Sequence, residues 1–395
     1  MRGSLVVVGN GMAGARFVAE LQRAAGDAFD LTVIGAEPYP AYNRILLSSL
    51  LAGDKTVEEL ALEDGANLPV RRGERVVAID RAARQIRTDR GATISYDRLV
   101  LATGSNSVVL PIAGCNLPGV VAFRGVDDVT RMMAARESGD HAVVVGGGLL
   151  GLEAAEGLRR RGFKVTVVHL MPWLMERQLD APAAELLRAT LEARGIRFEL
   201  DATTEAVLGE NRVQGVRLED GRELPADLVV MAVGIRPNVQ VAAEAGLACN
   251  RGILVDDALR SSDPAIHAIG ECAEHRGRVY GLVAPLWEQA RVLARHLAGE
   301  VAGYEGSVVA TSLKVTGVGI YSAGEIDLSE DDIVLTDAER GVYRKLNLRD
   351  GRVVGAVLVG DTADGGFFFD LIRSGRSVAE WRGSLAFGAA YAPAE

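Results

Sequence analysis

Two glycine-rich turns are the part of this sequence best suited to chemistry, because each could hold the pyrophosphate of a dinucleotide. Residues 9–14 read GNGMAG and residues 146–151 read GGGLLG. In such a turn the first glycine allows a tight bend, the second lets backbone amides approach the phosphates, and the third lets helix and strand pack closely. The N-terminus of the following helix adds partial positive charge. Two such turns in one chain predict two bound nucleotides.

Each turn lies between elements of the required kind. The apolar run 5–8 precedes the first turn, a helical pattern over 15–23 follows it, and a second strand is expected over 31–34. The second copy has an expected strand over 142–145, a helix to about residue 161 and a strand over 164–168. A glycine motif indicates dinucleotide binding in this context of strand, turn, helix and strand.

The residue that follows the second strand of each copy should reach the adenosine ribose hydroxyls. In the first copy Glu37 offers a carboxylate there, with a solvated charge at a strand end as the alternative. In the second copy the matching position holds His169. An acid bonds the hydroxyls and repels a 2′-phosphate, so His169 predicts relaxed specificity with measurable use of NADPH. The alternative is that His169 bonds the ribose and NADH remains preferred.

Composition narrows the class of protein. A chain of 395 residues suggests two or three domains of about 100–200 residues each. The net charge of −10 argues against a general nucleic-acid binder, which needs a basic surface. The sequence has no apolar run near the roughly 18 residues of a membrane span and no signal-peptide pattern, so we expect a cytoplasmic protein that does not bind membranes. The five histidines lack metal-ligand spacing, so no metal site is expected.

The cysteine pattern excludes several redox centres. Cys115, Cys249 and Cys272 are far apart in the sequence, so a CxxC pair, an iron–sulfur ligand set and a cysteine-rich zinc site are all absent. We interpret the three cysteines as reduced structural thiols.

Further elements follow from apolar runs and turn residues. Strands are expected over 98–102, 227–233 and 266–269. The last ninety or so residues predict antiparallel strands over 308–318, 342–348 and 353–359, a hairpin turn at 349–352 and a helix over 367–374. A flexible tail is expected after about residue 383.

The order of motifs resembles a known family, the two-dinucleotide-binding-domain flavoprotein reductases of the FAD-dependent pyridine nucleotide-disulfide oxidoreductase superfamily. The motifs are the two turns, DRLVLATG at 97–104, AVGIRPN at 232–238 and IHAIGECA at 266–273. The resemblance implies an α/β fold with two Rossmann-like dinucleotide-binding domains, the NAD domain inserted in the FAD domain, and a small α+β C-terminal domain. The implied boundaries are 1–115 and 240–304 for the FAD domain, 116–239 for the NAD(P) domain, and 305–395 for the last domain.

The motifs and the resemblance together assign FAD and NAD(P)H as cofactors. Glu153, on the helix after the second turn, matches the position that contacts the nicotinamide, with a helix-surface glutamate as the alternative. It is the candidate catalytic residue. The resemblance also implies that a strand over 75–80 lies along the adenine, with the backbone of Val77 as the contact. The expected cofactor-binding residues are Gly9, Gly11, Met12, Ala13, Gly14, Glu37, Arg44, Val77, Ala102, Thr103, Gly104, Gly146, Gly148, Leu149, Leu150, Gly151, Glu153, His169, Gly234, Gly270, Glu271, Pro285, Leu286 and Trp287. For Arg44 and Trp287 the alternatives are a surface salt bridge and an ordinary packing residue.

Within the family, the sequence is similar to the FAD portion of NAD(P)H nitrite reductases and to the flavoprotein component of assimilatory nitrate reductases. The similar segments are 42–50, 171–180 and 280–285. Glutathione- and thioredoxin-reductase-like members pass electrons to a cysteine pair, and the NADH oxidase and peroxidase group uses a single cysteine early in the N-terminal domain. This chain has no such pair, and its first cysteine is Cys115. The resemblance therefore implies an electron-transfer reductase without a redox-active disulfide. Its implied partner is a separate redox protein of nitrate or nitrite assimilation. The alternatives are a rubredoxin or ferredoxin reductase, with a small iron–sulfur protein as partner, and a slow-turnover nucleotide-binding redox sensor.

Overall fold

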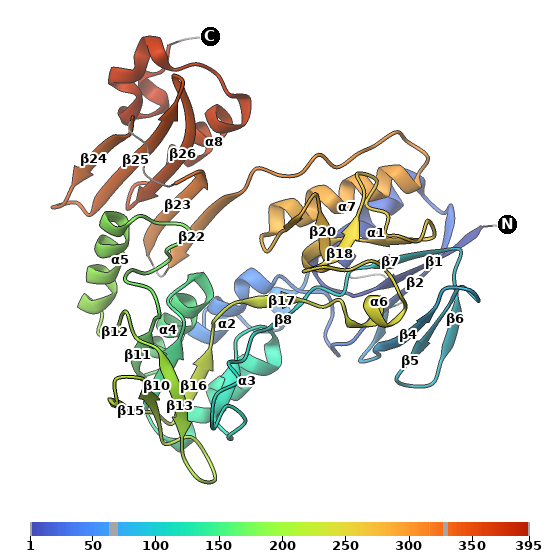
Figure 1. Cartoon of the computed structure of the whole chain (residues 1–395), viewed down its shortest axis with the longest axis horizontal. Coiled ribbons are helices and arrows are strands. Elements are labelled where there is room, and N and C mark those ends of the chain that lie inside the picture. Colours follow the sequence, from blue (N-terminus) through green and yellow to red (C-terminus); the bar gives the residue numbers. More distant parts are fainter. Residues whose placement is uncertain (1, 63–69, 316, 327–330, 394–395) are drawn as a thin grey trace. The chain divides into compact units, whose positions relative to one another are not determined.

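The computed structural model describes residues 2–62, 70–315, 317–326 and 331–393. Two compact units make up the chain, and Figure 1 labels their helices and strands. Unit 1 comprises Met1–Leu47, Lys55–Asn106 and Ile235–Ser307, and unit 2 comprises Ser48–Asp54, Ser107–Gly234 and Val308–Glu395.

Unit 1 is built on a parallel five-stranded sheet. Its strand order is β19-β7-β1-β2-β3, with β19 (Ile266–Ala268), β7 (Arg98–Leu101), β1 (Gly3–Val8), β2 (Phe29–Gly35) and β3 (Val70–Arg72). Every neighbouring pair is parallel. β1 and β7 are almost wholly apolar, as expected for strands that are covered on both faces. The pairing of β19 with β7 returns the chain to its first sheet, as expected for a fold with an inserted domain.

Helices α1 (Met12–Ala25) and α7 (Val283–Leu297) pack together on one face of this sheet (Figure 1). The other face packs against the antiparallel sheet β4 (Val76–Asp80), β5 (Gln85–Thr88) and β6 (Thr93–Ser95) and against α6 (Gln240–Glu244). The smaller elements of unit 1 are β8 (Ser105–Ser107), β17 (Ile235–Pro237), β18 (Ile253–Val255), β20 (Ala273–His275) and β21 (Arg278–Val279). The expected strand over 75–80 is therefore present, in the antiparallel sheet.

Unit 2 repeats the parallel architecture. Its sheet has the order β12-β11-β10-β16-β9, with β12 (Arg197–Glu199), β11 (Lys164–Val168), β10 (His141–Val145), β16 (Leu228–Met231) and β9 (Val120–Ala122). Helix α4 (Leu149–Arg160) follows β10, and the strands β13 (Thr204–Leu208), β14 (Gly215–Leu218) and β15 (Glu223–Pro225) share a core with β10 and β16. The remaining helices of this part are α2 (Leu47–Ala52), α3 (Val126–Ala134) and α5 (Ala181–Ala193).

The C-terminal part of unit 2 is an antiparallel sheet of order β22-β23-β26-β25-β24. Its strands are β22 (Ala310–Val315), β23 (Val318–Gly324), β26 (Arg352–Val359), β25 (Val342–Arg349) and β24 (Ile333–Asp337). Helix α8 (Gly365–Ser374) packs on it through Phe368 and Leu371. The predicted hairpin turn is confirmed, because Asp350 and Gly351 have φ of 51° and 66°, the left-handed values that a two-residue turn requires.

Two expectations for this region were wrong. The single strand expected over 308–318 is two strands, because the chain reverses around Gly317, whose φ of 93° suits a turn. The tail expected after residue 383 is ordered as 3₁₀ helices over Ala379–Phe387 and Ala389–Tyr391, and Leu385 lies buried in the core with α8.

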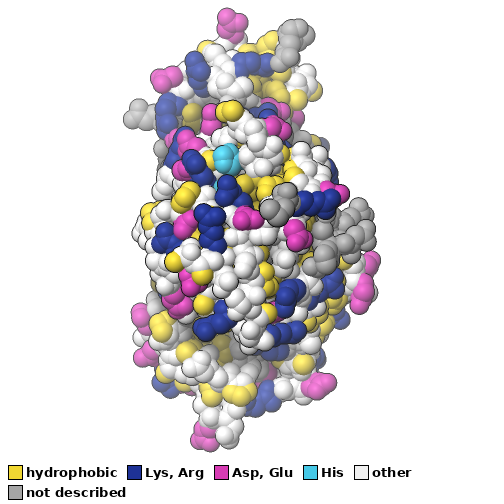
Figure 2. Space-filling view, turned by 90° about the vertical axis from the view of Figure 1, so that its right-hand side faces the viewer, with side chains coloured by type: hydrophobic (Ala, Val, Ile, Leu, Met, Phe, Trp, Pro, Cys, Tyr) yellow, Lys and Arg dark blue, Asp and Glu magenta, His cyan; other side chains and the backbone are white. Residues whose placement is uncertain are grey.

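The surface carries charges of both signs. On the face seen in Figure 2, Lys and Arg side chains are interspersed with Asp and Glu, and neither sign forms one continuous area. Among the described residues, no helix combines the length and apolar character needed to cross a bilayer.

Candidate nucleotide-binding sites

The first glycine turn joins β1 to α1, and its three glycines occupy three different environments. A Cβ atom on Gly9, whose φ is +118°, would lie 2.1 Å from the Ala102 carbonyl oxygen. A Cβ on Gly14 would lie 2.0 Å from the Gly9 carbonyl oxygen. A Cβ on Gly11 would meet no protein atom within 4 Å. Gly9 and Gly14 are therefore required by close packing, whereas Gly11 borders open space.

The second turn, between β10 and α4, repeats this arrangement. A Cβ on Gly146 would lie 2.4 Å from the Ala232 carbonyl oxygen, and one on Gly151 would lie 1.9 Å from the Gly146 carbonyl oxygen. A Cβ on Gly148 would again meet nothing within 4 Å. In both turns the middle glycine is the position where a phosphate must approach the backbone.

The helix starts at both turns suit an anion. Gly11 and Gly148 are the N-cap residues of α1 and α4, and neither helix start has a side-chain cap or an acidic residue in its first turn. The first turns of α1 and α4 begin at Met12 and Leu149, and their amide groups remain available to a ligand. A pyrophosphate at each helix N-terminus would satisfy these donors and benefit from the helix dipole. The residues at both turns therefore fit the dinucleotides expected from the sequence.

A cavity of about 280 Å³ opens beside the first turn. It brings together three expected residues, Gly9, Val77 and Thr103. The expected contact of Val77 with the adenine is consistent with this position, since β4 forms one wall. The full lining is Val8, Gly9, Ile34, Ala36, Glu74, Arg75, Val76, Val77, Thr103, Asn238, Gln240, Val241 and Glu244.

Sequence reasoning missed the acids and amides of this lining. Glu74 is 3% exposed and accepts hydrogen bonds from the Thr88 hydroxyl, at 2.6 Å, and from Arg71. The Thr103 hydroxyl donates to the Asn238 carbonyl oxygen at 2.7 Å. Asn238 is the last residue of the AVGIRPN motif, and its place in that motif could have identified it as a residue of the site. For Glu74 the sequence offers no motif, only a position shortly before an expected strand.

Glu37 and Arg44 form one charged cluster with Tyr42. The Arg44 guanidinium pairs with Glu37, and the Tyr42 hydroxyl accepts from Arg44 Nη1 and donates to Glu37 Oε2, each at 2.7 Å. Burial disfavours the charged form of Arg44, but Tyr42 and Glu37 outweigh it and raise the Arg44 pKa above its ordinary value. The sequence predicted both residues at the FAD, and the structure places them in contact with each other.

The loop that carries Gly270 and Glu271 is fixed by two residues that the sequence did not single out. Gly270 has a φ of +85°, and its amide donates to Oε1 of Gln289, a fully buried side chain of α7, at 2.8 Å. The Ser105 hydroxyl donates to Glu271 Oε2 at 2.6 Å. Ser105 follows Gly104 at the end of the LATG segment, so Glu271 lies beside the expected residues of that loop.

The start of α7 contains Pro285, Leu286 and Trp287. The first two are buried, whereas the Trp287 ring is 36% exposed and lies 5.3 Å from the Arg16 guanidinium that stacks over it. Trp287 therefore makes a cation–π contact within unit 1.

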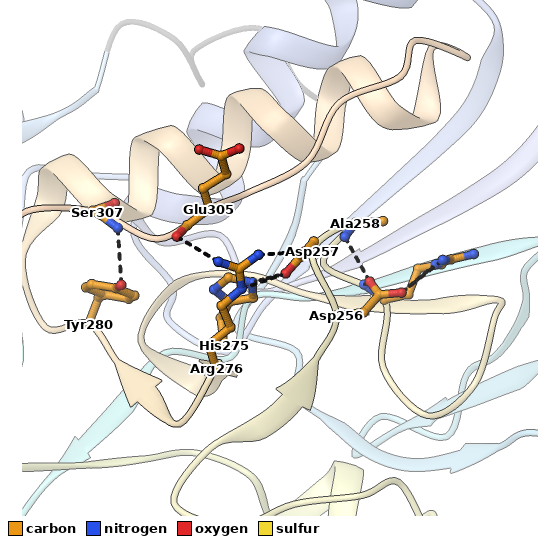
Figure 3. A network of polar contacts seen from close by, with 9 residues as sticks. Asp256, Asp257, Ala258, His275, Arg276, Tyr280, Glu305 and Ser307 are labelled. Atoms are coloured by element: carbon orange, nitrogen blue, oxygen red, sulfur yellow. Dashed lines mark hydrogen bonds and ion pairs between the residues drawn. The ribbon is translucent and has the colours of Figure 1, made fainter.

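A polar network anchors the chain that follows α7 (Figure 3). The Ser307 amide donates to the Tyr280 hydroxyl at 3.1 Å, and the Ser307 hydroxyl bonds to Glu288 of α7. Nearby, Arg276 and His275 bond the Asp257 carboxylate and lower its pKa to about 2. Ser307 thus connects α7 to Tyr280 at the end of the β20–β21 hairpin, and Asp257 connects that hairpin to the chain after β18.

Glu153 and His169 belong to unit 2. Glu153 lies on α4, one turn from its start, and burial raises the pKa of its carboxyl to about 7. His169 directly follows β11, and its ring is in contact with the second glycine turn. Leu149 and Leu150 are the first two residues of α4. Gly234 has a φ of +110° and ends the segment after β16.

The three cysteines are free thiols. Burial raises the pKa of Cys272, and it also raises that of Cys249. Cys272 donates to the carbonyl oxygens of Leu101 and Ile269, at 3.5 and 3.2 Å. None of these features activates a thiol as a nucleophile.

A known family matches most of this chain. Residues 3–295 match the family model described as pyridine nucleotide-disulphide oxidoreductase. The chain belongs to the pyridine nucleotide-disulphide oxidoreductase family. Proteins of this family are oxidoreductases that bind FAD and use NAD(P)H, in agreement with the two nucleotides expected from the sequence. Residues 310–376 match the model of the rubredoxin NAD+ reductase C-terminal domain.

Individual members of the family resemble nearly the whole chain. The nitrite reductase [NAD(P)H] of Bacillus subtilis (strain 168) is 49% identical over 384 residues, which cover 95% of this chain and 48% of that protein. The assimilatory nitrate reductase electron transfer subunit of the same organism is 42% identical over 383 residues, covering 95% and 50%. The chain spans about half the length of these two relatives. Among solved structures, a ferredoxin reductase from Rhodopseudomonas palustris has a TM-score of 0.89 and 30% identity, covering 98% of this chain and 97% of that one.

Proposed function

We propose that this chain is an NAD(P)H-dependent reductase that binds FAD in unit 1 and the nicotinamide coenzyme in unit 2, and passes electrons to a redox protein of nitrate or nitrite assimilation. The observation that carries the proposal is the pair of matching turns, in which Gly11 and Gly148 border open space while their neighbouring glycines are closely packed. Bound FAD would supply the chemistry, by taking a hydride from the coenzyme and releasing electrons to the acceptor.

The chain's own residues bind and orient the two cofactors. In unit 1 the turn at Gly11 would hold the FAD pyrophosphate, Thr103, Gly104, Gly270 and Glu271 the ribityl and phosphate region, and the start of α7 the pyrimidine end. In unit 2 the turn at 146–151 and His169 would hold the coenzyme, with Glu153 at the nicotinamide. The division into domains at 1–115 with 240–304, 116–239 and 305–395 belongs to this proposal.

The acceptor follows from the relatives and from the cysteines. The two Bacillus subtilis proteins are by name a nitrite reductase and a nitrate reductase electron transfer subunit. The three cysteines lack the spacing for an iron–sulfur cluster, so this chain's own residues do not provide that kind of acceptor centre. Electrons would therefore leave the flavin for a centre outside these residues.

A rubredoxin or ferredoxin reductase is the second candidate. Two observations favour it: the match of residues 310–376 to a rubredoxin reductase domain, and the ferredoxin reductase structure, which the chain covers almost end to end.

The test begins with the purified protein. We expect it to be yellow with one non-covalent FAD per chain, and to reduce ferricyanide rapidly with NADH. Rapid turnover with a partner from a nitrate- or nitrite-reducing system, and slow turnover with rubredoxin, would support the first candidate, and the reverse would support the second. A protein that does not take up FAD would contradict both, and slow ferricyanide reduction by an FAD-loaded protein would favour a redox sensor.

A further inference from the structure

A carboxylate lies next to the second glycine turn, although the residue at the end of β11 is a histidine. Because β10 and β11 are parallel neighbours, His169 lies beside the turn that follows β10. The Gly147 amide donates to Nδ1 of His169 at 3.0 Å. The second ring nitrogen, Nε2, lies 3.2 Å from Oε2 of Glu176.

These contacts determine the role of the His169 ring. Nδ1 accepts a hydrogen bond, so the neutral ring carries its proton on Nε2 and donates it to Glu176. The side chain of His169 is only 9% exposed. A Cβ atom on Gly147 would lie 2.7 Å from Cγ of the His169 ring. Both ring nitrogens are thus engaged, and the ring packs against the turn. It is therefore poorly placed to attract a 2′-phosphate.

A second contact fixes Glu176 near the turn. The carbonyl oxygen of Gly147 accepts from the amide of Met175, at 3.1 Å, so both backbone groups of Gly147 bind the segment 169–176. Met175 is fully buried and has a φ of 55°, a value that non-glycine residues adopt only where the surroundings hold them. The residue after it, Glu176, keeps 26% of its side chain exposed.

The charge at this end of the site is therefore negative. One oxygen of Glu176 accepts from His169, and the other, Oε1, lies 4.0 Å from Nε of Arg177, whose side chain is 86% exposed. Such an exposed contact contributes little. A carboxylate beyond the end of the second strand is what a Rossmann site uses to bond ribose hydroxyls and to repel a 2′-phosphate.

We propose that Glu176, oriented by His169, reads the adenosine ribose of the coenzyme and makes NADH the preferred substrate over NADPH. The acid that other sites of this kind carry at the strand end comes here from seven residues further along the chain. The proposal rests on the proposed function, because it assumes that unit 2 binds a nicotinamide coenzyme.

The test uses two fragments that differ only in the 2′-phosphate, adenosine 5′-phosphate and adenosine 2′,5′-bisphosphate. Each is titrated into the FAD-loaded protein by calorimetry, so the result does not depend on turnover. We expect the wild type to bind the monophosphate more tightly. The ratio of the dissociation constant of the bisphosphate to that of the monophosphate measures this discrimination. In Glu176→Gln this ratio should fall at least about tenfold, or about 1.4 kcal/mol. Glu176→Asp, which keeps the charge, should retain much of the discrimination.

Two controls separate a direct role from a general loss of charge or structure. Glu185 is exposed on α5 and pairs with Arg188, so Glu185→Gln removes a carboxylate of unit 2 without touching the turn. It should leave the ratio unchanged. Arg177→Ala should also leave it unchanged, because the proposal gives Arg177 no phosphate to bind.

The following outcomes would overturn the proposal. Equal binding of the two fragments by the wild type, or an unchanged ratio in Glu176→Gln, would mean that Glu176 only supports His169. If the ratio of the two dissociation constants fell as much in Glu185→Gln as in Glu176→Gln, the effect would come from the loss of charge in general and not from Glu176. A selective loss of bisphosphate binding in Arg177→Ala would assign the site to NADPH. If the FAD-loaded wild type bound neither fragment, the coenzyme site of the proposed function would fail as well.

Discussion

Gly11 and Gly148 occupy equivalent places in their turns, and they differ from the other turn glycines in what surrounds them. Their φ values, −90° and −82°, are ordinary for any residue, and a Cβ on either would touch no protein atom. The folded chain by itself therefore gives no reason for glycine there. A bound phosphate would give one, because a methyl group would occupy its place.

This predicts two variants with separable defects. Gly11→Ala should fold normally but weaken FAD binding by at least about tenfold, or ~1.4 kcal/mol. Gly148→Ala should keep its FAD and weaken coenzyme binding by a similar factor. The flavin absorbance of each purified variant and calorimetry with NAD+ are the measurements. Full flavin content and unchanged FAD affinity in Gly11→Ala would contradict this assignment of the first turn.

Glu153 gives a prediction for pH dependence. Its folded-state pKa is raised by burial from 4.5 to about 7. The folded chain therefore holds the proton more tightly than the unfolded chain, so the stabilisation is full below about pH 4.5 and is lost as pH rises to about 7. Relative to Glu153→Gln, the wild type should lose on the order of 2 kcal/mol of unfolding free energy between about pH 5 and about pH 8. Urea unfolding of both proteins at the two pH values measures this, and an equal change in both would show that Glu153 titrates normally.

At the scale of elements, α7 connects the candidate FAD site to the rest of unit 1. Gln289 of this helix holds the Gly270 amide, and Glu288 bonds Ser307. Tyr280, just before the helix, accepts from the Ser307 amide. The helix that is expected to face the flavin is thus held near its N-terminus by hydrogen bonds to the Gly270 loop and to Ser307, which give it a defined position.

Removing one of these bonds should destabilise unit 1. Tyr280 is 5% exposed, and Tyr280→Phe leaves the Ser307 amide without its acceptor, at a cost of about 1–3 kcal/mol. Chemical denaturation of the flavin-loaded protein measures the change. Tyr391→Phe, at a position 62% exposed, is the matched control and should have little effect. Equal stability of Tyr280→Phe and wild type would show that this bond does not hold the segment.

At the scale of the whole molecule, the proposed path of the electrons does not use a thiol. Cys115 lies in unit 2, while Cys249 and Cys272 lie in unit 1, and all three are free. The two thiols of unit 1 have raised pKa values, the opposite of what a redox-active cysteine needs. Family membership alone would suggest disulphide chemistry, and the cysteine positions argue against it for this chain.

We therefore expect a variant with Cys115, Cys249 and Cys272 all replaced by serine to keep its electron transfer to ferricyanide. Serine can still donate to the carbonyl oxygens that Cys272 bonds, so the fold should be retained. Rates measured by stopped flow should change by less than about tenfold, which is ~1.4 kcal/mol of barrier. A larger loss in a folded, FAD-loaded variant would reveal a redox role for one of the thiols.

The fold class and the two glycine turns could be predicted from the amino-acid sequence, because both depend on local patterns. Short apolar strands, glycines at fixed spacing and helical periodicity describe each strand–turn–helix–strand segment within about thirty residues. The turn at Asp350 and Gly351 was predictable for the same reason. The run over 308–318 was not, because its apolar residues continue across the reversal at Gly317 and hide it.

Contacts between side chains that are far apart in the sequence follow from the packing of distant segments. Ser105 and Glu271 are 166 positions apart, and Glu74 reaches its cavity only because β4 packs beside the parallel sheet. Glu176 is the clearest case, since the pattern of the second turn assigned its role to His169. A carboxylate can come from any segment that folds back to the site, so residue spacing along one strand cannot locate it. The two bonds that Gly147 makes to the segment 169–176, together with the contact between His169 and Glu176, place Glu176 there.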